Sequence, residues 1–397
     1  MSRQVRARRP RGASRVGARF EVVVGPVAHG GHCVARVPDE QSPSGTRVVF
    51  VRHTLPGERI VLEVTEGTEG DRFWRADAVE VLEASPDRVA APCRLAGPGL
   101  CGGCDFQHVT LERQRGLKAD VVREQLSRLA GLDVPVEVEA VPAPPGDPAA
   151  ADVDQGLRWR TRVQWASGPR GERALRKHRS REVVVVDDCP ITRRDARDAA
   201  ARGTVVERVD AAGAVHGFEV DADGFWQVHP GAPATLVEAV LAALAPRPGE
   251  RVLDLYAGVG LFARFLADAV GPGGRVVAVE ADRRAAGHAA ANLAGAAEVA
   301  RGPVDRVLAT AYDEPFDLVV LDPPREGARR PVVEQVVARS PRGVAYVACD
   351  PAALARDVGI FAEHGYNMSG LRAFDLFPMT HHVECVALLE RTDSDLR

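Results

Sequence analysis

The 397-residue sequence lacks any run of about eighteen apolar residues, the length that a membrane-spanning helix requires. We therefore expect no membrane partner. The sequence also opens without the apolar segment of a secretory signal peptide, which favours a cytoplasmic location. Its seven cysteines do not form the dense pattern of a disulfide framework. They predict metal ligands, a nucleophile or small core residues.

An excess of positive charge is lacking too, because the formal net charge is −4. Any binding of RNA must therefore come from local basic surface. Seven arginines between residues 3 and 19 precede the first acid, Glu21. A phosphate-binding arm, a transit peptide and a disordered tail all fit this segment. Lysine occurs only at Lys118 and Lys177, so arginine is preferred along the whole chain, and this favours the disordered tail.

The pattern of the chain predicts an α/β protein with three domains. Residues 15–83 hold short β-rich runs between glycine and proline turns and predict an OB-like β-barrel, a fold that often binds oligonucleotides. Residues 84–230 predict a central α+β insert, with a helix that ends before Gly131 and a Pro/Ala-rich linker or long loop at 141–156. Residues 231–397 predict a Rossmann-like, doubly wound domain, because apolar strands alternate with helices there.

Polar residues follow the predicted parallel strands of this last domain, where doubly wound folds bind ligands. Gly258 and Gly260 lie at the first strand-to-helix turn, and Glu280 ends the second strand, where it can accept hydrogen bonds from ribose hydroxyls. These residues also fit an NAD-binding fingerprint. Asp322 decides against NAD, since the D-P-P turn resembles methyltransferases that act on bases or exocyclic amines. Arg325 stands where the amine subclass has an aromatic residue.

Cys349 ends the fifth predicted strand, directly before Asp350, a candidate N-cap, and Pro351. We expect the helix end to lower the pKa of its thiol and so favour the thiolate. A thiolate that adds to C6 of uracil creates the electron density at C5 that a methylation needs. The alternative interpretation is a small buried cysteine.

Glu384 lies in the last predicted strand, among apolar residues. A buried carboxylate is costly unless it is paired or functional, and a raised pKa would suit removal of the C5 proton. The alternative is a salt bridge with an arginine. Cys33 and Cys385 are interpreted as packing residues, and His381 and His382 as a polar turn.

The segments LDLYAGVGLF, LDPPREG, YVACDPAALARD and HHVECVALL, in this order, resemble the RNA (uracil-5)-methyltransferase family, and GFWQVHPGA resembles its F-x-Q-V-N element. The resemblance runs from about residue 19 to the C-terminus. It implies methyl transfer from S-adenosyl-L-methionine to C5 of a uridine in structured RNA, with ribosomal RNA preferred over transfer RNA. It also implies a nucleophile at Cys349, a general base at Glu384, and donor binding by Gln227, Tyr256, Glu280 and Asp322. The chain departs from the family at His229, Asp350 and Leu261, where asparagine is common.

Four cysteines, at Cys93, Cys101, Cys104 and Cys189, could bind a structural zinc ion or a [4Fe–4S] cluster. The C-G-G-C-x-x-Q-H run resembles the iron–sulfur members of the family and favours the cluster, although seven residues separate the first two cysteines where five are common. The N-terminal barrel resembles a TRAM domain, which implies RNA binding. The same resemblance implies that residues 84–230 hold the iron–sulfur segment and a central RNA-binding α+β domain. We assume a monomer. The alternatives are an NAD-dependent oxidoreductase on a Rossmann sheet and a non-catalytic RNA-binding protein.

Overall fold

The computed structural model describes residues 12–391 and groups them into two compact units that interleave along the chain. The first unit holds the residues up to Gln114, residues 166–187 and Met379–His381. The second holds residues 115–165, 188–378 and those from His382 onward. Most of the arginine-rich N-terminal segment, residues 1–11, lies outside the described range. The three predicted domains, 15–83, 84–230 and 231–397, stay a prediction.

The first unit is built around a six-stranded sheet in the order β1-β5-β6-β4-β3-β2. Its pairs are antiparallel except for β4 and β6, which run parallel. Alternate residues point inward, so Val49, Val51, Ile60, Leu62 and Trp74 are almost fully buried. The strands are β1 (Arg19–Val23), β2 (Val27–Ala28), β3 (His32–Pro38), β4 (Thr46–Arg52), β5 (Arg59–Glu66) and β6 (Phe73–Glu83).

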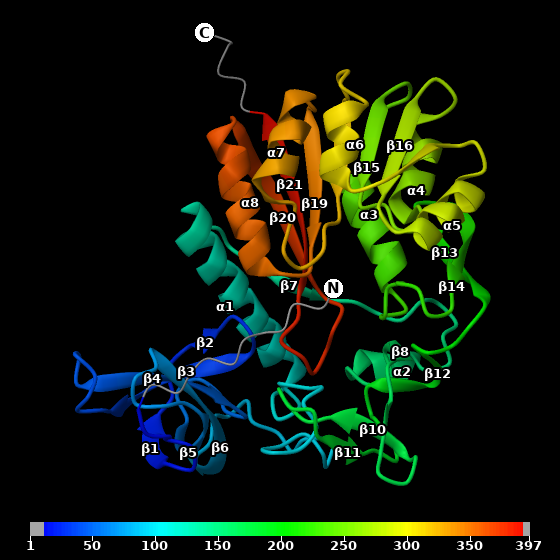
Figure 1. The fold of residues 1–397 in the computed structure, drawn as a ribbon. Coiled ribbons are helices and arrows are strands. Elements are labelled where there is room, and N and C mark those ends of the chain that lie inside the picture. The colour runs from blue at the N-terminus through cyan, green and yellow to red at the C-terminus, as the bar shows by residue number, and fades with distance from the viewer. Residues whose placement is uncertain (1–11, 392–397) are drawn as a thin grey trace. The chain divides into compact units, whose positions relative to one another are not determined.

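A separate three-stranded antiparallel sheet, in the order β11-β10-β9, also belongs to the first unit (Figure 1). Its strands are β9 (Ala166–Ser167), β10 (Arg173–Arg176) and β11 (Val183–Val185). Strand β11 covers only Val183–Val185 of the apolar run that follows Glu182. It ends before Asp187 and Asp188, whose exposed carboxylates pair with arginines instead.

The second unit contains an eight-stranded sheet in the order β17-β16-β15-β18-β19-β21-β20-β7. Strands β17, β16, β15, β18 and β19 run parallel, whereas β21 lies antiparallel between β19 and β20. The strands are β7 (Val138–Ala140), β15 (Arg251–Leu255), β16 (Arg275–Glu280), β17 (Glu298–Arg301), β18 (Leu318–Leu321), β19 (Gly343–Ala348), β20 (Tyr366–Asp375) and β21 (Glu384–Arg391).

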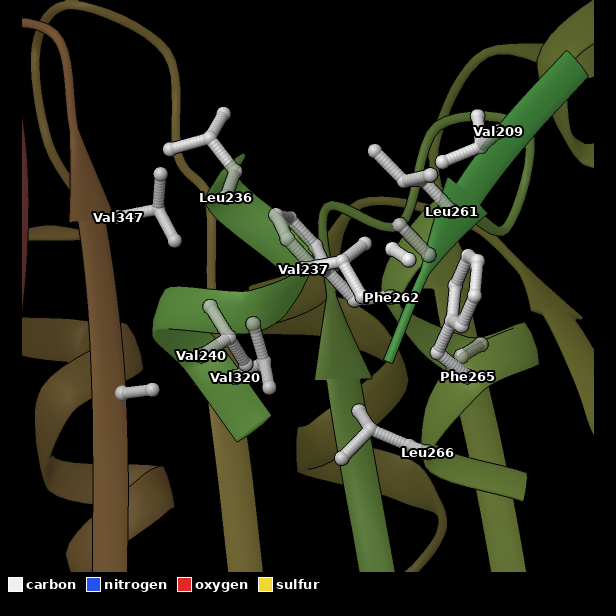
Figure 2. Packing of buried hydrophobic residues seen from close by; sticks show 14 of the residues in the cluster. Val209, Leu236, Val237, Val240, Leu261, Phe262, Phe265, Leu266, Val320 and Val347 are labelled. Carbon is white, nitrogen blue, oxygen red and sulfur yellow. The ribbon is translucent and has the colours of Figure 1, made fainter. Parts of the chain in front are cut away.

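Helices cover both faces of this sheet, as the doubly wound prediction requires. Helices α3 (Ala232–Leu244), α4 (Leu261–Val270) and α5 (Arg283–Leu293) share one apolar core with the sheet. Figure 2 shows part of it, with Val240 of α3 near Val320 of β18. On the other face lie α6 (Val304–Thr310), α7 (Arg329–Ala338), α8 (Pro351–Glu363) and the second-unit part of α1 (Leu111–Ala130).

The remaining elements of the second unit are α2 (Ala150–Asp154), β8 (Arg160–Val163), β12 (Thr192–Asp198), β13 (Thr204–Ala211) and β14 (Ala214–Asp221). β13 and β14 form a hairpin whose Val209 and Phe218 join the core of α3 and α4. The predicted linker at 141–156 is partly wrong, because it contains α2 and because Asp147 forms a mostly buried ion pair with Arg193. Within residues 12–391, no helix has both the length and the hydropathy to cross a membrane.

Candidate active site

The carboxyl ends of β15, β16, β18 and β19 meet at one edge of the parallel sheet, and each carries a predicted site residue. Tyr256 follows β15, Glu280 ends β16, Asp322 follows β18 and Cys349 follows β19. The register of the parallel pairs keeps these ends level, since Leu255 pairs with both Val279 and Leu321. The topology therefore gathers side chains that are far apart in the sequence.

The turn after β15 is held open toward this edge by its backbone conformation. Gly258 and Gly260 have φ angles of 57° and 93°, which favour glycine, and Tyr256 also has a positive φ of 66°. A Cβ added at Gly260 would meet Leu293 at 3.1 Å, whereas one added at Gly258 would meet nothing within 4 Å. Gly260 thus packs the turn onto α5, and the space beside Gly258 is available to a ligand.

Glu280 is fixed by two backbone amides. Its Oε2 accepts a hydrogen bond from the amide of Gly258 at 2.8 Å, and its Oε1 accepts one from the amide of Asp282 at 2.6 Å. Each carboxylate oxygen has a further lone pair, so the side chain can still accept hydrogen bonds from ribose hydroxyls. This geometry fits the predicted role in donor binding.

Asp254 is a site residue that the sequence reasoning missed. It is fully buried, and its Oδ2 accepts a hydrogen bond from the amide of Ala263 at 2.8 Å, while its Oδ1 has no partner among the described residues. Burial raises its pKa to about 7, and the Asp322 and Glu280 carboxylates add to the increase. The sequence could have indicated this residue, because Asp254 is a single acid in an apolar strand, the same pattern that pointed to Glu384.

Asp322 belongs to the same acidic group. Burial, and then the Glu280 carboxylate, raise the pKa of Asp322 to about 7. Several carboxylates close together without a matching cation are costly, and such clusters mark functional sites. The donor set of Asp254, Glu280 and Asp322 fits a ligand with a positive charge and ribose hydroxyls, which is the chemistry of S-adenosyl-L-methionine.

Cys349 and Glu384 are brought together by β21. Ala348 pairs with Cys385 in the antiparallel ladder of β19 and β21, so the next position outward sets Cys349 opposite Glu384. Opposite residues in such a ladder share a face, with Cβ atoms about 4.5–5.5 Å apart. The pKa of the Cys349 thiol responds to the Glu384 carboxylate, which agrees with this placement. The two residues therefore face the same space.

The pKa of the Cys349 thiol differs from the predicted one. Asp350 caps α8, accepting a hydrogen bond from the amide of Ala353 at 2.9 Å, as expected. However, burial, followed by the Glu384 and Asp322 carboxylates, raises the pKa of Cys349 to about 12. The predicted lowering is wrong because these effects, together with the negative charge of Asp350 itself, outweigh the helix end. Burial and the Asp322 carboxylate raise the pKa of Glu384 well above its usual value, as predicted.

Arg325 brings a positive charge to the pair of Cys349 and Glu384. Its charge lowers the pKa values of Cys349 and Glu384, opposing the larger effects of burial. The sequence reasoning used this residue only to exclude amine substrates. Its exposed side chain gives the site a positive charge that favours the ionised forms of both groups.

Gln227 lies in the second unit between the buried Trp226 and the half-buried Val228. The carbonyl of Val228 accepts hydrogen bonds from the amide of Thr161 at 2.9 Å and from its hydroxyl at 3.0 Å. The segment is thus held in place, and Gln227 itself is half-buried, which is compatible with the predicted contact to the methyl donor.

Three predicted metal ligands, Cys93, Cys101 and Cys104, lie in one loop of the first unit. The side chain of Gln107 ties this loop together, accepting from the amide of Cys93 at 2.9 Å and donating to Sγ of Cys104 at 3.1 Å. Cys189 belongs to the second unit. In the part of the chain that the structure describes, no group of three or more His, Cys, Asp or Glu side chains is arranged to hold a metal ion. The packing roles predicted for Cys33 and Cys385 agree with their burial.

Comparisons with known proteins show the family that this chain resembles. A family model described as tRNA (Uracil-5-)-methyltransferase matches residues 305–392, a methyltransferase small domain matches residues 234–344 and a TRAM domain matches residues 13–79. An uncharacterized RNA methyltransferase of Streptomyces avermitilis is 45% identical over 94% of this chain and 99% of its own length. A 23S rRNA (uracil(1939)-C(5))-methyltransferase of Halomonas elongata is 31% identical over 96% of this chain and 91% of its own length.

The fold also has a solved counterpart. The structure of the Pyrococcus abyssi tRNA (uracil-54, C5)-methyltransferase, in complex with S-adenosyl-L-homocysteine, superposes with a TM-score of 0.65. The two chains are 21% identical, and the match covers 93% of this chain and 100% of the other. At this identity the likeness supports the predicted fold class.

Proposed function

This chain belongs to the RNA uracil-C5 methyltransferase family, and from that premise we propose that it methylates C5 of a uridine in structured RNA with S-adenosyl-L-methionine as the donor. The observation that carries the proposal is the pairing of Cys349 with Glu384 at the edge where Asp254, Glu280 and Asp322 gather. We take ribosomal RNA as the preferred substrate, since a relative at 31% identity is named for 23S rRNA, with transfer RNA second.

S-adenosyl-L-methionine, when bound, supplies an electrophilic methyl group on a positively charged sulfur. Glu280 would accept hydrogen bonds from its ribose, and Asp254 and Asp322 would offset its charge. Gln227 and Tyr256 are the remaining residues proposed to bind the donor. The raised pKa values of Asp254 and Asp322 show that their ionised forms are unfavourable without a partner. A positively charged ligand at this edge would stabilise both carboxylates.

In the proposed mechanism, Cys349 releases its thiol proton to water, and the thiolate adds to C6 of the uracil. The electron pair of the C5–C6 double bond moves toward C5 and the O4 carbonyl. C5 then forms a bond to the donor's methyl group, while the bond from that methyl group to sulfur breaks and its electron pair stays on the sulfur. Glu384 removes the remaining C5 proton, and the electrons of that C–H bond restore the double bond and release the Cys349 thiolate. A uridine in an unpaired loop would reach Cys349 at the lowest cost in stacking.

The decisive experiment combines RNA that contains 5-fluorouridine with the wild-type chain and with Cys349→Ala. Fluorine at C5 cannot leave as a proton, so we expect a covalent protein–RNA adduct that survives denaturing electrophoresis only when Cys349 is present. Absence of the adduct and of 5-methyluridine formation by the wild-type chain would favour the non-catalytic alternative. Family membership overturns the NAD-dependent oxidoreductase.

We further propose that Cys93, Cys101, Cys104 and Cys189 bind a structural [4Fe–4S] cluster, with zinc as the alternative. The support is the resemblance of the C-G-G-C-x-x-Q-H run to iron–sulfur members of the family; no step of methyl transfer depends on it. Iron, zinc and acid-labile sulfide contents of anaerobically purified protein distinguish the two metals, and Cys104→Ser should lower the content of whichever is bound. A monomeric state and a cytoplasmic location stay predictions.

A further inference from the structure

The loop between β18 and α7 carries two charged groups of the candidate site, Asp322 and Arg325. Its first part is fixed by the sheet, since the amide of Asp322 donates to the carbonyl of Leu255 at 3.2 Å and two prolines follow. Its second part, residues 326–329, is bound instead by side chains of β19 and α8. All of these residues belong to the second unit.

Asp357 of α8 is the centre of this contact. It is completely buried, as is Tyr346 of β19, whose hydroxyl donates to Oδ2 of Asp357 at 2.7 Å. The same Oδ2 accepts a hydrogen bond from the amide of Arg329 at 3.1 Å, and the Tyr346 oxygen accepts one from the amide of Ala328 at 3.0 Å. Two consecutive loop amides are therefore bound by two buried side chains.

Arg356, the neighbour of Asp357 on α8, completes the contact. Its Nε donates to Oδ1 of Asp357 at 2.9 Å, and its Nη2 donates to the carbonyl of Glu326 at 2.7 Å. The buried carboxylate is thereby paired with a positive charge, which lowers the cost of its burial. We call Tyr346, Arg356 and Asp357 the loop clamp.

The backbone of the loop is shaped to fit the loop clamp. Gly327 has a φ of 77°, and Arg329 has a φ of 65°, which is uncommon for a residue with a Cβ. A Cβ added at Gly327 would lie 2.5 Å from Oδ2 of Asp357 and closer still to Nη2 of Arg356. Strained backbone of this kind persists only where the surrounding contacts fix it, and it is frequent at functional sites.

Helix α8 connects the loop clamp to the nucleophile. It begins at Pro351, two positions after Cys349. Arg325 lies in the clamped loop, and its charge acts on both Cys349 and Glu384. One helix therefore holds the backbone that follows Cys349 and the loop that carries Arg325.

We propose that the loop clamp positions Arg325 at the site, and that formation of the Cys349 thiolate depends on it. The three residues of the loop clamp are positioning residues, which act through Arg325. This inference rests on the proposed function for the use of the thiolate.

The charges around the Cys349 thiol give the direction of the expected effect. Glu384, Asp322 and Asp350 raise the pKa of the thiol, whereas Arg325 lowers it. A loop that moves Arg325 away leaves the three acids less opposed. The fraction of thiolate at a given pH should then fall, and Cys349 should react more slowly.

The first experiment compares Tyr346→Phe with Tyr366→Phe. Tyr346→Phe keeps a buried ring and removes the hydroxyl that joins Ala328 to Asp357. Tyr366 is 2% exposed, and its hydroxyl donates to the carbonyl of Pro341 at 2.8 Å, before the amino end of β19. Since each variant loses hydrogen bonds of one buried hydroxyl, both melting temperatures should fall. Only Tyr346→Phe should change the reactivity of the site.

Iodoacetamide alkylation of Cys349, followed by mass spectrometry of its peptide, measures the thiolate without RNA. At pH 9 we expect Tyr346→Phe to react about three- to tenfold more slowly than the wild type, and Tyr366→Phe to react like the wild type. Arg325→Ala should also react slowly. The double variant Tyr346→Phe/Arg325→Ala should react no more slowly than Arg325→Ala, because the loop clamp then has no charge to position. Equal rates in Tyr346→Phe and the wild type would overturn the proposal, as would additive effects in the double variant.

The second experiment compares Gly327→Ala with Gly365→Ala. Both glycines have a positive φ, 77° and 80°, but an added Cβ at Gly365 meets nothing within 4 Å. The two variants therefore share backbone strain, and only Gly327→Ala also disturbs the loop clamp. We expect Gly327→Ala alone to slow both the alkylation of Cys349 and the formation of the 5-fluorouridine adduct. Equal rates in the two variants would refute the role of the loop clamp.

The two readouts keep this inference apart from the proposed function. Slower alkylation in Tyr346→Phe, together with no uridine methylation by the wild type, would contradict the proposed function and support the loop clamp. Uridine methylation by the wild type, together with unchanged alkylation in Tyr346→Phe, would overturn the loop clamp alone.

Discussion

The substitution Glu384→Gln should separate two effects of one carboxylate. The Glu384 carboxylate, once ionised, opposes ionisation of Cys349, whose pKa is raised to about 12 by burial and then by this neighbour. At pH 8 a thiol with a pKa of about 12 is ionised in roughly one molecule in ten thousand, which corresponds to about 5 kcal/mol. Glutamine keeps the size of the side chain and removes its charge, so Cys349 should ionise at a lower pH in the variant.

Methyl transfer should nevertheless stop short of product. Without a base for the C5 proton, elimination of Cys349 should slow by roughly 10²- to 10⁴-fold, the usual contribution of general base catalysis. The methylated RNA should then remain attached to the protein. Glu384→Gln is therefore expected to react faster with a thiol reagent and to turn over more slowly.

Two assays check this pair of effects. The rate of iodoacetamide alkylation between pH 7 and pH 11 reports ionisation of Cys349, with Cys349→Ala as the blank for the other cysteines. Denaturing electrophoresis after incubation with RNA and S-adenosyl-L-methionine reports the trapped adduct. Glu363→Gln, which removes a surface carboxylate paired with Arg330, is the matched control. Slower alkylation together with no adduct in Glu384→Gln would refute the reasoning.

Three further predictions follow from buried groups. Because the folded protein raises the pKa of Asp254 to about 7, it binds this proton more tightly than the unfolded chain, so stability falls as pH rises from about 4 to 7. In Asp254→Asn the free energy of unfolding should therefore rise by up to about 4 kcal/mol at pH 8 and by little at pH 4. Urea unfolding at both pH values measures this difference. Lys118 forms a buried ion pair with Asp375 at 2.5 Å. Lys118→Met should lower the free energy of unfolding by about 3–5 kcal/mol, because it leaves the charge of Asp375 buried without its partner. A change below about 1 kcal/mol would argue against the ion pair. Gly260→Ala, with φ at 93° and Leu293 in contact, should lower the melting temperature and the affinity for S-adenosyl-L-homocysteine together.

The sequence by itself was sufficient to predict the sheet of the second unit and most of the elements around it. Apolar strands that alternate with helices predicted the doubly wound sheet, and the polar residues after those strands predicted its functional edge. These features are local, since strand ends, helix caps and glycine turns depend on neighbouring residues. The N-cap at Asp350 and the end of α1 before Gly131 were correct for this reason.

Only the tertiary structure decided the properties that depend on distant residues. Strand β21 lies antiparallel between β19 and β20, and this brings Glu384 opposite Cys349. The same closeness, with burial, reversed the expected direction of the pKa of Cys349. Likewise, strands β9, β10 and β11 join the first unit although the chain before and after them belongs to the second. A local sequence pattern cannot predict these properties, because solvation and Coulomb interactions depend on which surfaces the folded chain brings together.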